Sequence, residues 1–309
     1  MKTNHTMNDK LVSIITPLYN SERFVGQTIE SVLAQTYAPI EIIVVDDNGV
    51  NTPFQEETEK LLSPYISDRK ITYLKHEVNK NGSAARNTGT RASHGEIIGY
   101  LDDDDIFMPT KIEEQVKRLQ EAHAINPRAA GVYCNIEKQG YKKANNANTT
   151  NKLEGNLSEA ILIGEVRLNS STILLYRFAF DAIEGWDERF LRHQDWEFCI
   201  RFFRKYEMVL ACPSTCLVVK HHTPNFNTSH PEKMAQNMDF FLTEMMQDIE
   251  KMPKGKEILS RRYLNVAKHS FELKRYHEGR EFLRKSLKYN FIGVKGCWEL
   301  MKGIIKGIV

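Results

Sequence analysis

The chain has 309 residues, of which 41% are hydrophobic and 27% are charged. That composition is ordinary for a globular protein and excludes a mostly disordered, collagen-like or coiled-coil chain. The 42 Lys and Arg nearly balance the 40 Asp and Glu, which leaves a net charge of +2. Nucleic-acid-binding proteins usually carry a strong basic excess, so the overall charge argues against that class of partner.

Neither a targeting signal nor a disulfide framework is expected. No apolar run is long enough to span a membrane, and residues 1–10 lack the apolar core of a signal peptide. We therefore expect a cytoplasmic protein. An odd number of scattered cysteines in a reducing compartment favours small buried side chains over disulfides. These are Cys134, Cys199, Cys212, Cys216 and Cys297.

Strand-like and helix-like patterns alternate along the first 125 residues. The predicted strands are 11–16, 40–45, 71–74 and 96–101, and the predicted helices are 21–34, 58–66, 83–92 and 112–124. Ser21 is the expected N-cap of the first helix. The near-continuous apolar run 40–45 is typical of a strand buried on both faces of a parallel sheet. This order predicts an α/β fold with a mainly parallel sheet flanked by helices.

The later part of the chain changes character twice. Residues 140–155 are polar and rich in Asn, which predicts a loop. After 231 the pattern is almost wholly helical, so we expect one domain over 1–228 and a helical C-terminal region over 229–309. Two helical stretches within 258–289 weakly resemble one tetratricopeptide unit, which must dock to bury its apolar face. For 258–309 the open alternatives are core packing, a homodimer contact, and peripheral contact of 291–309 with an anionic membrane.

Polar residues cluster where the predicted strands end. Tyr19 follows the first strand, Asp46 and Asp47 follow the second, and residues 102–105 follow the fourth. Ligands of parallel α/β sheets bind outside the carboxyl ends of the strands. We therefore expect these residues to line one ligand site. A plain turn at Asp46 and Asp47 is the alternative, because Asn-Gly comes next.

Four consecutive aspartates, 102–105, are the strongest chemical signal. An acidic run is often only a solvated face, but this one directly follows the apolar residues 97–101. Adjacent carboxylates repel each other unless they are solvated or neutralised by a cation. Mg²⁺ and Mn²⁺ favour such oxygen ligands and share them with substrate phosphates. The position therefore favours a divalent metal site.

Three further segments have candidate chemistry. Arg86 lies one turn into a helix of small residues and can reach an anion, although a structural ion pair is the alternative. Residues 185–197 mix acidic and aromatic side chains, as sugar sites often do, and Asp195 or Glu197 is a candidate general base. His221 and His222 can bind a metal or a leaving phosphate, although either is more often structural.

Together these motifs resemble a family-2 glycosyltransferase with a GT-A fold. The resemblance covers residues 10–229, and five motifs occur in the family's order. They are the opening strand and nucleotide loop at 12–20, the second strand and its Asp pair at 40–47, the Ala-Arg-Asn helix around Arg86, the Asp-x-Asp-Asp run at 101–105, and the acceptor segment at 185–201. Glu184 departs from the family pattern, which has Gly there, and Gln194 stands where the family has Glu.

The resemblance implies a role for each matching residue. The nucleoside contacts are Thr16, Tyr19, Asp46 and Asp47, and Arg86 contacts the diphosphate or the base. The metal ligands are Asp104, Asp102 and His222, and the alternative role of Asp102 in the family's pattern is to hold the ribose. The catalytic base is Asp195, and the acceptor-side residues are Trp186, Gln194 and Trp196. Which of His221 and His222 faces the site stays open.

The implied reaction is an inverting transfer of one sugar. The donor is a nucleoside-diphosphate sugar, expected to be a UDP-sugar, and the cofactor is Mn²⁺ or Mg²⁺. The expected acceptor is a saccharide or lipid-linked saccharide in bacterial surface-polysaccharide assembly. No nucleic-acid partner is expected. Peripheral contact of the protein with the inner face of the plasma membrane is an open alternative. The alternative is a degenerate nucleotide-sugar-binding or scaffold protein of the same pathway.

Overall fold

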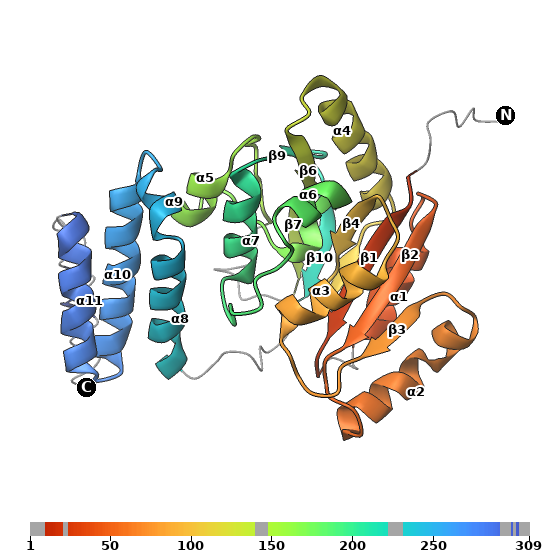
Figure 1. The fold of residues 1–309 in the computed structure, drawn as a ribbon, viewed down its shortest axis with the longest axis horizontal. Helices are drawn as coiled ribbons and strands as arrows, with labels where there is room; N and C mark the ends of the chain where they lie inside the picture. Colours follow the sequence, from red (N-terminus) through yellow and green to blue (C-terminus); the bar gives the residue numbers. More distant parts are fainter. Residues whose placement is uncertain are drawn as a thin grey trace. The chain divides into compact units, whose positions relative to one another are not determined.

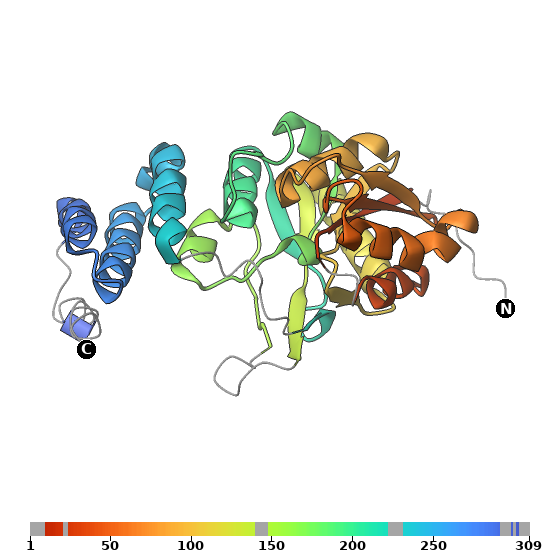
Figure 2. The same cartoon turned by 90° about the horizontal axis from the view of Figure 1, so that it is seen from below.

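The structure is a computed structural model that describes residues 10–20, 24–139, 148–221, 231–290, 298 and 301–302. These residues belong to two compact units. The first unit comprises the described residues up to 157 together with 166–189 and 201–221, and the second comprises 158–165, 190–200 and the described residues from 231 onward. Figures 1 and 2 show the elements of both units.

The first unit is built on a seven-stranded sheet of order β3-β2-β1-β4-β8-β6-β9. Its strands are β1 Val12–Leu18, β2 Ile40–Asp46, β3 Thr72–Lys75, β4 Ile97–Tyr100, β6 Ala129–Tyr133, β8 Leu174–Tyr176 and β9 Glu207–Leu210. β1 pairs in parallel with β2 and β4, β2 pairs in parallel with β3, and β6 pairs in parallel with β9. Only β8 runs antiparallel to its neighbours. The predicted mainly parallel sheet is confirmed.

A second, three-stranded sheet has the order β5-β10-β7. Its strands are β5 Asp105–Phe107, β7 Asn135–Gln139 and β10 Cys216–His221. The sequence patterns did not predict it, because β5 has only three residues and begins inside the acidic run. Its register sets Lys220 of β10 opposite Asp105 of β5. This pairing brings a cation from late in the chain to the acidic run.

Helices flank the large sheet. They are α1 Val25–Leu33, α2 Pro53–Ser67, α3 Gly82–Ala92, α4 Lys111–Ile125 and α6 Arg177–Ala182. Helix α3 lies against β1 and β2 (Figure 1). A Cβ on Gly89 would lie 2.5 Å from Cγ2 of Ile15 and 3.1 Å from Cγ2 of Val45, so glycine permits this close approach. The predicted cap Ser21 lies outside the described residues, and α1 begins at Val25.

The burial of the apolar side chains in the core of the first unit explains why these segments form strands. The inner residues of β1 and β2 are buried on both faces, and Val12, Ile14, Ile15, Val44 and Val45 are fully inaccessible. Burying each such side chain contributes roughly 1.5–3 kcal/mol. Of the predicted loop 140–155, residues 140–147 lie outside the described residues. Residues 148–154 form neither helix nor strand.

The second unit is helical. Its helices are α5 Ser158–Ile163, α8 Pro231–Glu244, α9 Met246–Glu250, α10 Gly255–Glu272 and α11 Tyr276–Tyr289, and α7 Gln194–Phe203 begins in it. Phe241, Leu259 and Phe282 lie in one apolar core, and α10 packs beside α11 (Figures 1 and 2). Within the described residues, no helix is both long and apolar enough to cross a membrane. The tail 291–309 lies outside the described residues except at 298 and 301–302.

Candidate active site

Asp46, at the end of β2, is enclosed by the protein. The side chain is fully buried; Oδ1 accepts a hydrogen bond from the Asn48 amide at 2.9 Å, and Oδ2 accepts one from the Tyr73 hydroxyl at 2.5 Å. Burial raises the pKa of Asp46, and the Tyr73 hydroxyl opposes that rise. Both carboxylate oxygens are therefore used within the fold.

Asp47, the next residue, is held through one oxygen only. Its Oδ1 lies 2.7 Å from Nδ1 of His76 and accepts the Lys80 amide at 2.8 Å. Nε2 of His76 lies 2.9 Å from the Thr88 hydroxyl. Within the part of the chain that the structure describes, Oδ2 of Asp47 has no hydrogen-bond partner. The carboxylate is thus fixed in orientation with one acceptor oxygen left for a ligand.

Sequence reasoning missed His76. It follows β3 directly, at the same edge of the sheet as Asp47, and its side chain is 5% exposed. The position next to a predicted strand end was the only available signal. Because Asp47 accepts the bond, we assign the ring proton to Nδ1, so that Nε2 accepts from Thr88.

Arg86 of α3 and Asp102 form the second cluster, at the ends of α3 and β4. The Arg86 guanidinium donates to Oδ1 of Asp102 at 2.8 Å and to the Ser170 hydroxyl at 3.1 Å, and Ser170 donates to the same Oδ1 at 2.9 Å. Burial alone would raise the pKa of Asp102, but the charges of Arg86 and Lys220 hold it below its usual range. As at Asp47, one oxygen is locked and Oδ2 has no partner among the described residues.

In the same acidic run, the fully buried Asp105 forms an ion pair with the half-buried Lys220. The Lys220 ammonium lies 3.2 Å and 3.3 Å from the two carboxylate oxygens, and the Ser171 hydroxyl donates to Oδ2 at 2.6 Å. Burial raises the pKa of Asp105 to about 7, although Lys220 opposes this. Burial would lower the pKa of Lys220, but Asp105 and Asp102 raise it overall. Lys220 therefore supplies a fixed positive charge to the acidic run.

The loop after β1 is tied to the same acidic run. The Tyr19 amide donates to Oδ2 of Asp103 at 3.0 Å, and the Thr28 hydroxyl donates to the Asp103 carbonyl at 3.0 Å. The Tyr19 ring is 44% exposed and is available for stacking. Thr16, in contrast, is fully buried in β1, and its hydroxyl has no hydrogen-bond partner among the described residues.

The donor set for a metal is incomplete in this structure. Among the described residues, no group of three or more His, Cys, Asp or Glu is arranged to hold an ion. Asp104 is partly exposed and lies two residues from Asp102, and carboxylate oxygens are ligands that Mg²⁺ and Mn²⁺ prefer. The remaining ligands would have to come from phosphates, water or His222, which lies outside the described residues.

Trp186 is buried behind Arg86. Its ring lies 4.9 Å from the Arg86 guanidinium and meets Tyr100 edge-on at 5.2 Å. Asn87 binds both the carbonyl and the amide of Trp186, at 2.8 Å and 2.9 Å. Because the ring is 2% exposed, it supports Arg86 from inside the fold. A direct contact with the acceptor stays a prediction.

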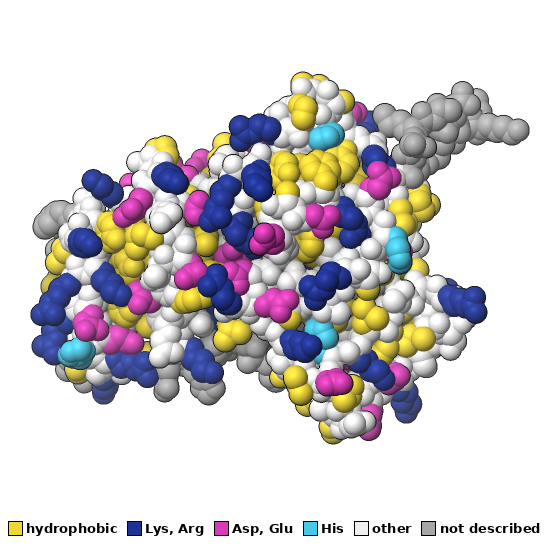
Figure 3. All heavy atoms as spheres, in the orientation of Figure 1, with side chains coloured by type: hydrophobic (Ala, Val, Ile, Leu, Met, Phe, Trp, Pro, Cys, Tyr) yellow, Lys and Arg dark blue, Asp and Glu magenta, His cyan; other side chains and the backbone are white. Residues whose placement is uncertain are grey.

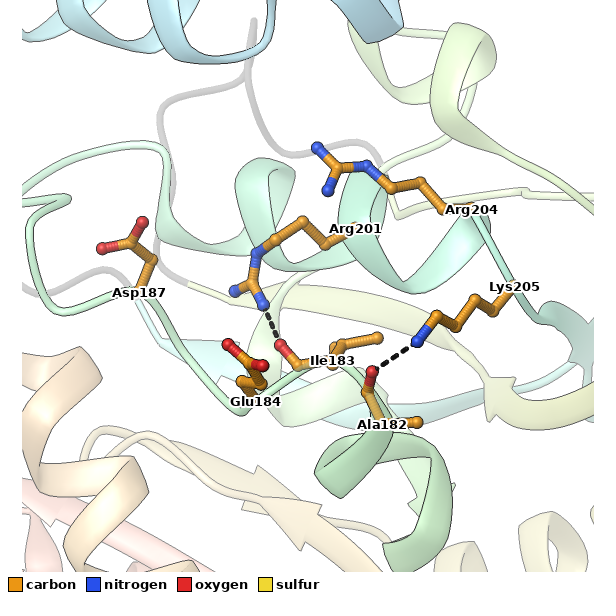
Figure 4. Close-up of a pocket in the computed structure, with 7 residues that line it drawn as sticks. All are labelled: Ala182, Ile183, Glu184, Asp187, Arg201, Arg204 and Lys205. Atoms are coloured by element: carbon orange, nitrogen blue, oxygen red, sulfur yellow. Dashed lines mark hydrogen bonds between the residues drawn. The ribbon is translucent and has the colours of Figure 1, made fainter.

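A pocket of about 370 Å³ lies next to the chain segment that contains Trp186 (Figure 4). Its lining residues are Ala182, Ile183, Glu184, Asp187, Arg201, Arg204 and Lys205. Arg201 donates to the carbonyls of Ile183 and Gly185, and Lys205 donates to the carbonyl of Ala182 at 2.8 Å. These cations brace the loop. That loop includes Glu184, whose φ of +60° is a region that L-residues rarely adopt.

In the second unit, Gln194 and Asp195 open helix α7. Gln194 donates to the Phe190 carbonyl at 2.8 Å, and Asp195 lies partly exposed in the first turn, where the helix dipole favours a negative charge. Trp196 stacks on His193 at 4.7 Å and on the Arg262 guanidinium at 4.4 Å. The base role of Asp195 and the acceptor role of Gln194 and Trp196 stay predictions.

The comparison with solved structures defines the fold class. S. aureus TarS 1–349 in complex with UDP-GlcNAc matches with a TM-score of 0.62 and 14% identity, covering 92% of each chain. The mannosyltransferase PcManGT from Pyrobaculum calidifontis in complex with GDP-Man and Mn²⁺ matches with a TM-score of 0.57 and 14% identity, covering 96% of this chain and 80% of that one. The chain has the fold of these GT-A glycosyltransferases.

The sequence comparison then gives the family. The profile of "Glycosyl transferase family 2" matches residues 13–182. The chain therefore belongs to glycosyltransferase family 2.

Two curated relatives illustrate the range of the match. The Escherichia coli UDP-Glc:alpha-D-GlcNAc-diphosphoundecaprenol beta-1,3-glucosyltransferase WfgD is 42% identical over 114 residues, which is 37% of this chain and 42% of that protein. The amylovoran biosynthesis glycosyltransferase AmsB of Erwinia amylovora is 28% identical over 246 residues, 77% of this chain and 79% of that protein. The matches to an uncharacterized glycosyltransferase of Rickettsia bellii and to RP339 of Rickettsia prowazekii span only 27% and 59% of those relatives.

Proposed function

We propose that this chain transfers one sugar from a UDP-sugar to an acceptor hydroxyl, with inversion at the anomeric carbon. The observation that carries the proposal is the pair of half-locked carboxylates, Asp47 and Asp102. Each has one oxygen bound within the fold and a second without a partner among the described residues. Asp47 suits the ring N–H of a uracil, Asp102 suits a ribose hydroxyl or a metal, and Arg86 suits the diphosphate.

A divalent cation, Mn²⁺ or Mg²⁺, is part of the proposal. Asp104 and Asp102 would hold it, with His222 as a further candidate ligand. When bound, such an ion neutralises the charge of the departing nucleoside diphosphate. The neighbour PcManGT supports this choice because it was solved with Mn²⁺. Lys220 adds a cation of the protein's own beside these aspartates, which lowers the charge that a metal has to neutralise.

Asp195 is the proposed base toward the acceptor hydroxyl. A carboxylate is a weak base toward a neutral alcohol, so proton transfer must be late and concerted with attack. Replacing it with Asn should remove most of a general-base contribution of roughly 10²–10⁴ in rate while UDP still binds. Unchanged turnover in Asp195→Asn would overturn the assignment.

The proposed acceptor is a saccharide or a lipid-linked saccharide of bacterial surface-polysaccharide assembly. WfgD is named for a diphosphoundecaprenol-linked acceptor and AmsB for amylovoran biosynthesis, and these names support the choice. A lipid-linked acceptor places the reaction at a membrane surface, so we propose a cytoplasmic protein that contacts the inner face of the plasma membrane.

Thermal unfolding with nucleoside diphosphates tests the proposal. UDP, GDP, CDP and dTDP are each added with and without Mn²⁺. A ligand at 100 times its Kd stabilises the fold by about 2.7 kcal/mol, a shift of roughly 5–10 °C. A UDP shift that needs Mn²⁺ is the expected result. A larger shift with a nucleoside diphosphate of another base would change the proposed donor. No shift with any of the four nucleoside diphosphates would favour the alternative of a degenerate scaffold protein.

A further inference from the structure

The charge of this chain is distributed very unevenly. Residues 251–309 contain 15 Lys and Arg but only five Asp and Glu, a net charge of +10, whereas the first 250 residues carry a net charge of −8. The described residues 251–290 alone carry 12 cationic and four anionic side chains. Such asymmetry within a nearly neutral chain indicates a binding face for an anionic surface.

Helix α11 concentrates this charge on one side. Arg280, Arg284 and Lys288 follow one another at four-residue spacing, so they lie on one side of the helix, and all three are exposed. None of them has a carboxylate at ion-pair distance among the described residues. The opposite side of α11, with Phe282 and Ser286, is buried against α10. We call Arg280, Arg284 and Lys288 the α11 basic stripe.

Figure 3 shows several Lys and Arg side chains on the visible face of the second unit around α11. The stripe residues differ from Lys285 of the same helix in their partners. Lys285, one residue away, is bound to Asp239 at 2.6 Å and covers the ring of Tyr263. Lys285 therefore has a carboxylate partner, which the residues of the α11 basic stripe lack among the described residues.

Exposed apolar side chains accompany the cations. Leu287, between two stripe residues, is 47% exposed. Beyond α11, Trp298 is 57% exposed and Met301 48% exposed, with the Lys302 ammonium 5.6 Å from the Trp298 ring. Cations mixed with Trp and aliphatic side chains are the composition of segments that lie at a membrane–water interface.

We propose that the second unit docks on an anionic lipid membrane through the α11 basic stripe, with the exposed Leu287 of the same helix entering the interface. The inference rests on the proposed function only for its purpose, which is to bring the enzyme to a lipid-linked acceptor. A membrane fits better than a nucleic acid because a flat surface needs one cationic face. Exposed apolar side chains also accompany these cations, and a membrane interface can bury them whereas a phosphate backbone cannot.

Vesicle sedimentation with the full chain tests this inference. The probes are phosphatidylcholine vesicles with and without phosphatidylglycerol. The variant combines Arg280→Gln, Arg284→Gln and Lys288→Gln. The matched control combines Lys60→Gln, Lys117→Gln and Lys152→Gln, three exposed cations of the first unit. Each cation near an anionic membrane strengthens binding about fivefold, so the stripe variant should bind about 100-fold more weakly.

The control variant should bind the anionic vesicles like the wild type, and added salt should release both. Equal binding of the stripe variant and the wild type would overturn the proposal, as would wild-type binding that ignores phosphatidylglycerol. Binding of duplex DNA but not of vesicles would also overturn it and assign the face to a polyanion. The UDP-induced thermal shift, measured on the same variants, should be unchanged. Loss of the shift in all proteins would instead count against the proposed function.

Discussion

The contact between His76 and Asp47 predicts a donor-binding defect from a residue that does not touch the donor. In His76→Ala, Asp47 loses the 2.7 Å bond to its Oδ1 and keeps only the Lys80 amide, while the Thr88 hydroxyl loses its 2.9 Å partner. Each buried group left without its partner costs about 1–3 kcal/mol. Thr88 is only half-buried and keeps the Arg91 guanidinium at 3.4 Å, so the loss at Asp47 dominates. We expect a loss of about 1–3 kcal/mol in stability, and a melting temperature lower by roughly 2–6 °C.

The effect on the donor is smaller than that of losing Asp47. A charge-assisted hydrogen bond contributes about 1.5–3 kcal/mol, which corresponds to about 10–150-fold in affinity. Because Asp47 in His76→Ala is loosened but still present, the Kd for UDP should rise about tenfold. The turnover number at saturating donor should stay near the wild-type value, because His76 contacts no reacting group.

Calorimetric titration of UDP, together with steady-state kinetics, checks this prediction. His76→Asn is the informative second variant, because its amide can replace Nδ1 toward Asp47 but cannot reach Thr88. It should recover most of the UDP affinity. His94→Ala is the matched control, since His94 is an exposed His on the same unit, bound to Glu41. The reasoning fails if folded His76→Ala binds UDP as tightly as the wild type.

Three further changes test the fold and the ion pair. Glu184→Gly should stabilise the protein by about 0.5–1 kcal/mol in chemical denaturation, because its φ of +60° suits glycine; a destabilised variant would contradict this. Gly89→Ala should destabilise by about 1–3 kcal/mol, because its Cβ meets Ile15 at 2.5 Å; an unchanged denaturation midpoint would show that α3 shifts freely. Lys220→Met should destabilise by up to about 3–5 kcal/mol at high pH, where the Asp105 carboxylate loses its cation. The pKa of Asp105 is about 7 even though Lys220 opposes its rise, so the pKa should be higher in the variant. The loss should therefore shrink as the pH falls toward about 7, because a protonated carboxyl needs no cation; a loss that grows on acidification would refute it.

The sequence predicted four strands of the large sheet, β1 to β4, because they are short runs with clear ends, but it did not predict β6, β8 and β9 individually. The run 40–45 became β2, and the acidic residues after it lie at the carboxyl edge, as expected for a parallel sheet. Helix α3 was predicted from small residues and is confirmed at Gly82–Ala92. These features depend on local patterns, which is why a single chain reveals them.

The partners of the predicted site residues could not be predicted in the same way. His76 and Lys220 meet the aspartates through pairings 29 and 115 residues apart in the chain. A local sequence pattern contains no information about contacts between residues so far apart in the chain. A single Lys at the end of the apolar strand β10 is typical of a residue at the edge of a sheet. The difference between Asp46 and Asp47 was also hidden, because it depends on Tyr73 and His76 rather than on the Asp pair itself.

Titration of UDP into Asp47→Asn and Asp46→Asn tests the central claim most directly. Oδ2 of Asp47 has no hydrogen-bond partner among the described residues, whereas both carboxylate oxygens of Asp46 accept hydrogen bonds within the fold. Asp47→Asn should therefore weaken UDP binding at least about tenfold with little change in melting temperature. Asp46→Asn should lower the melting temperature and leave the UDP affinity within about twofold. Unchanged UDP affinity in Asp47→Asn would contradict the assignment of this strand edge as the nucleotide site.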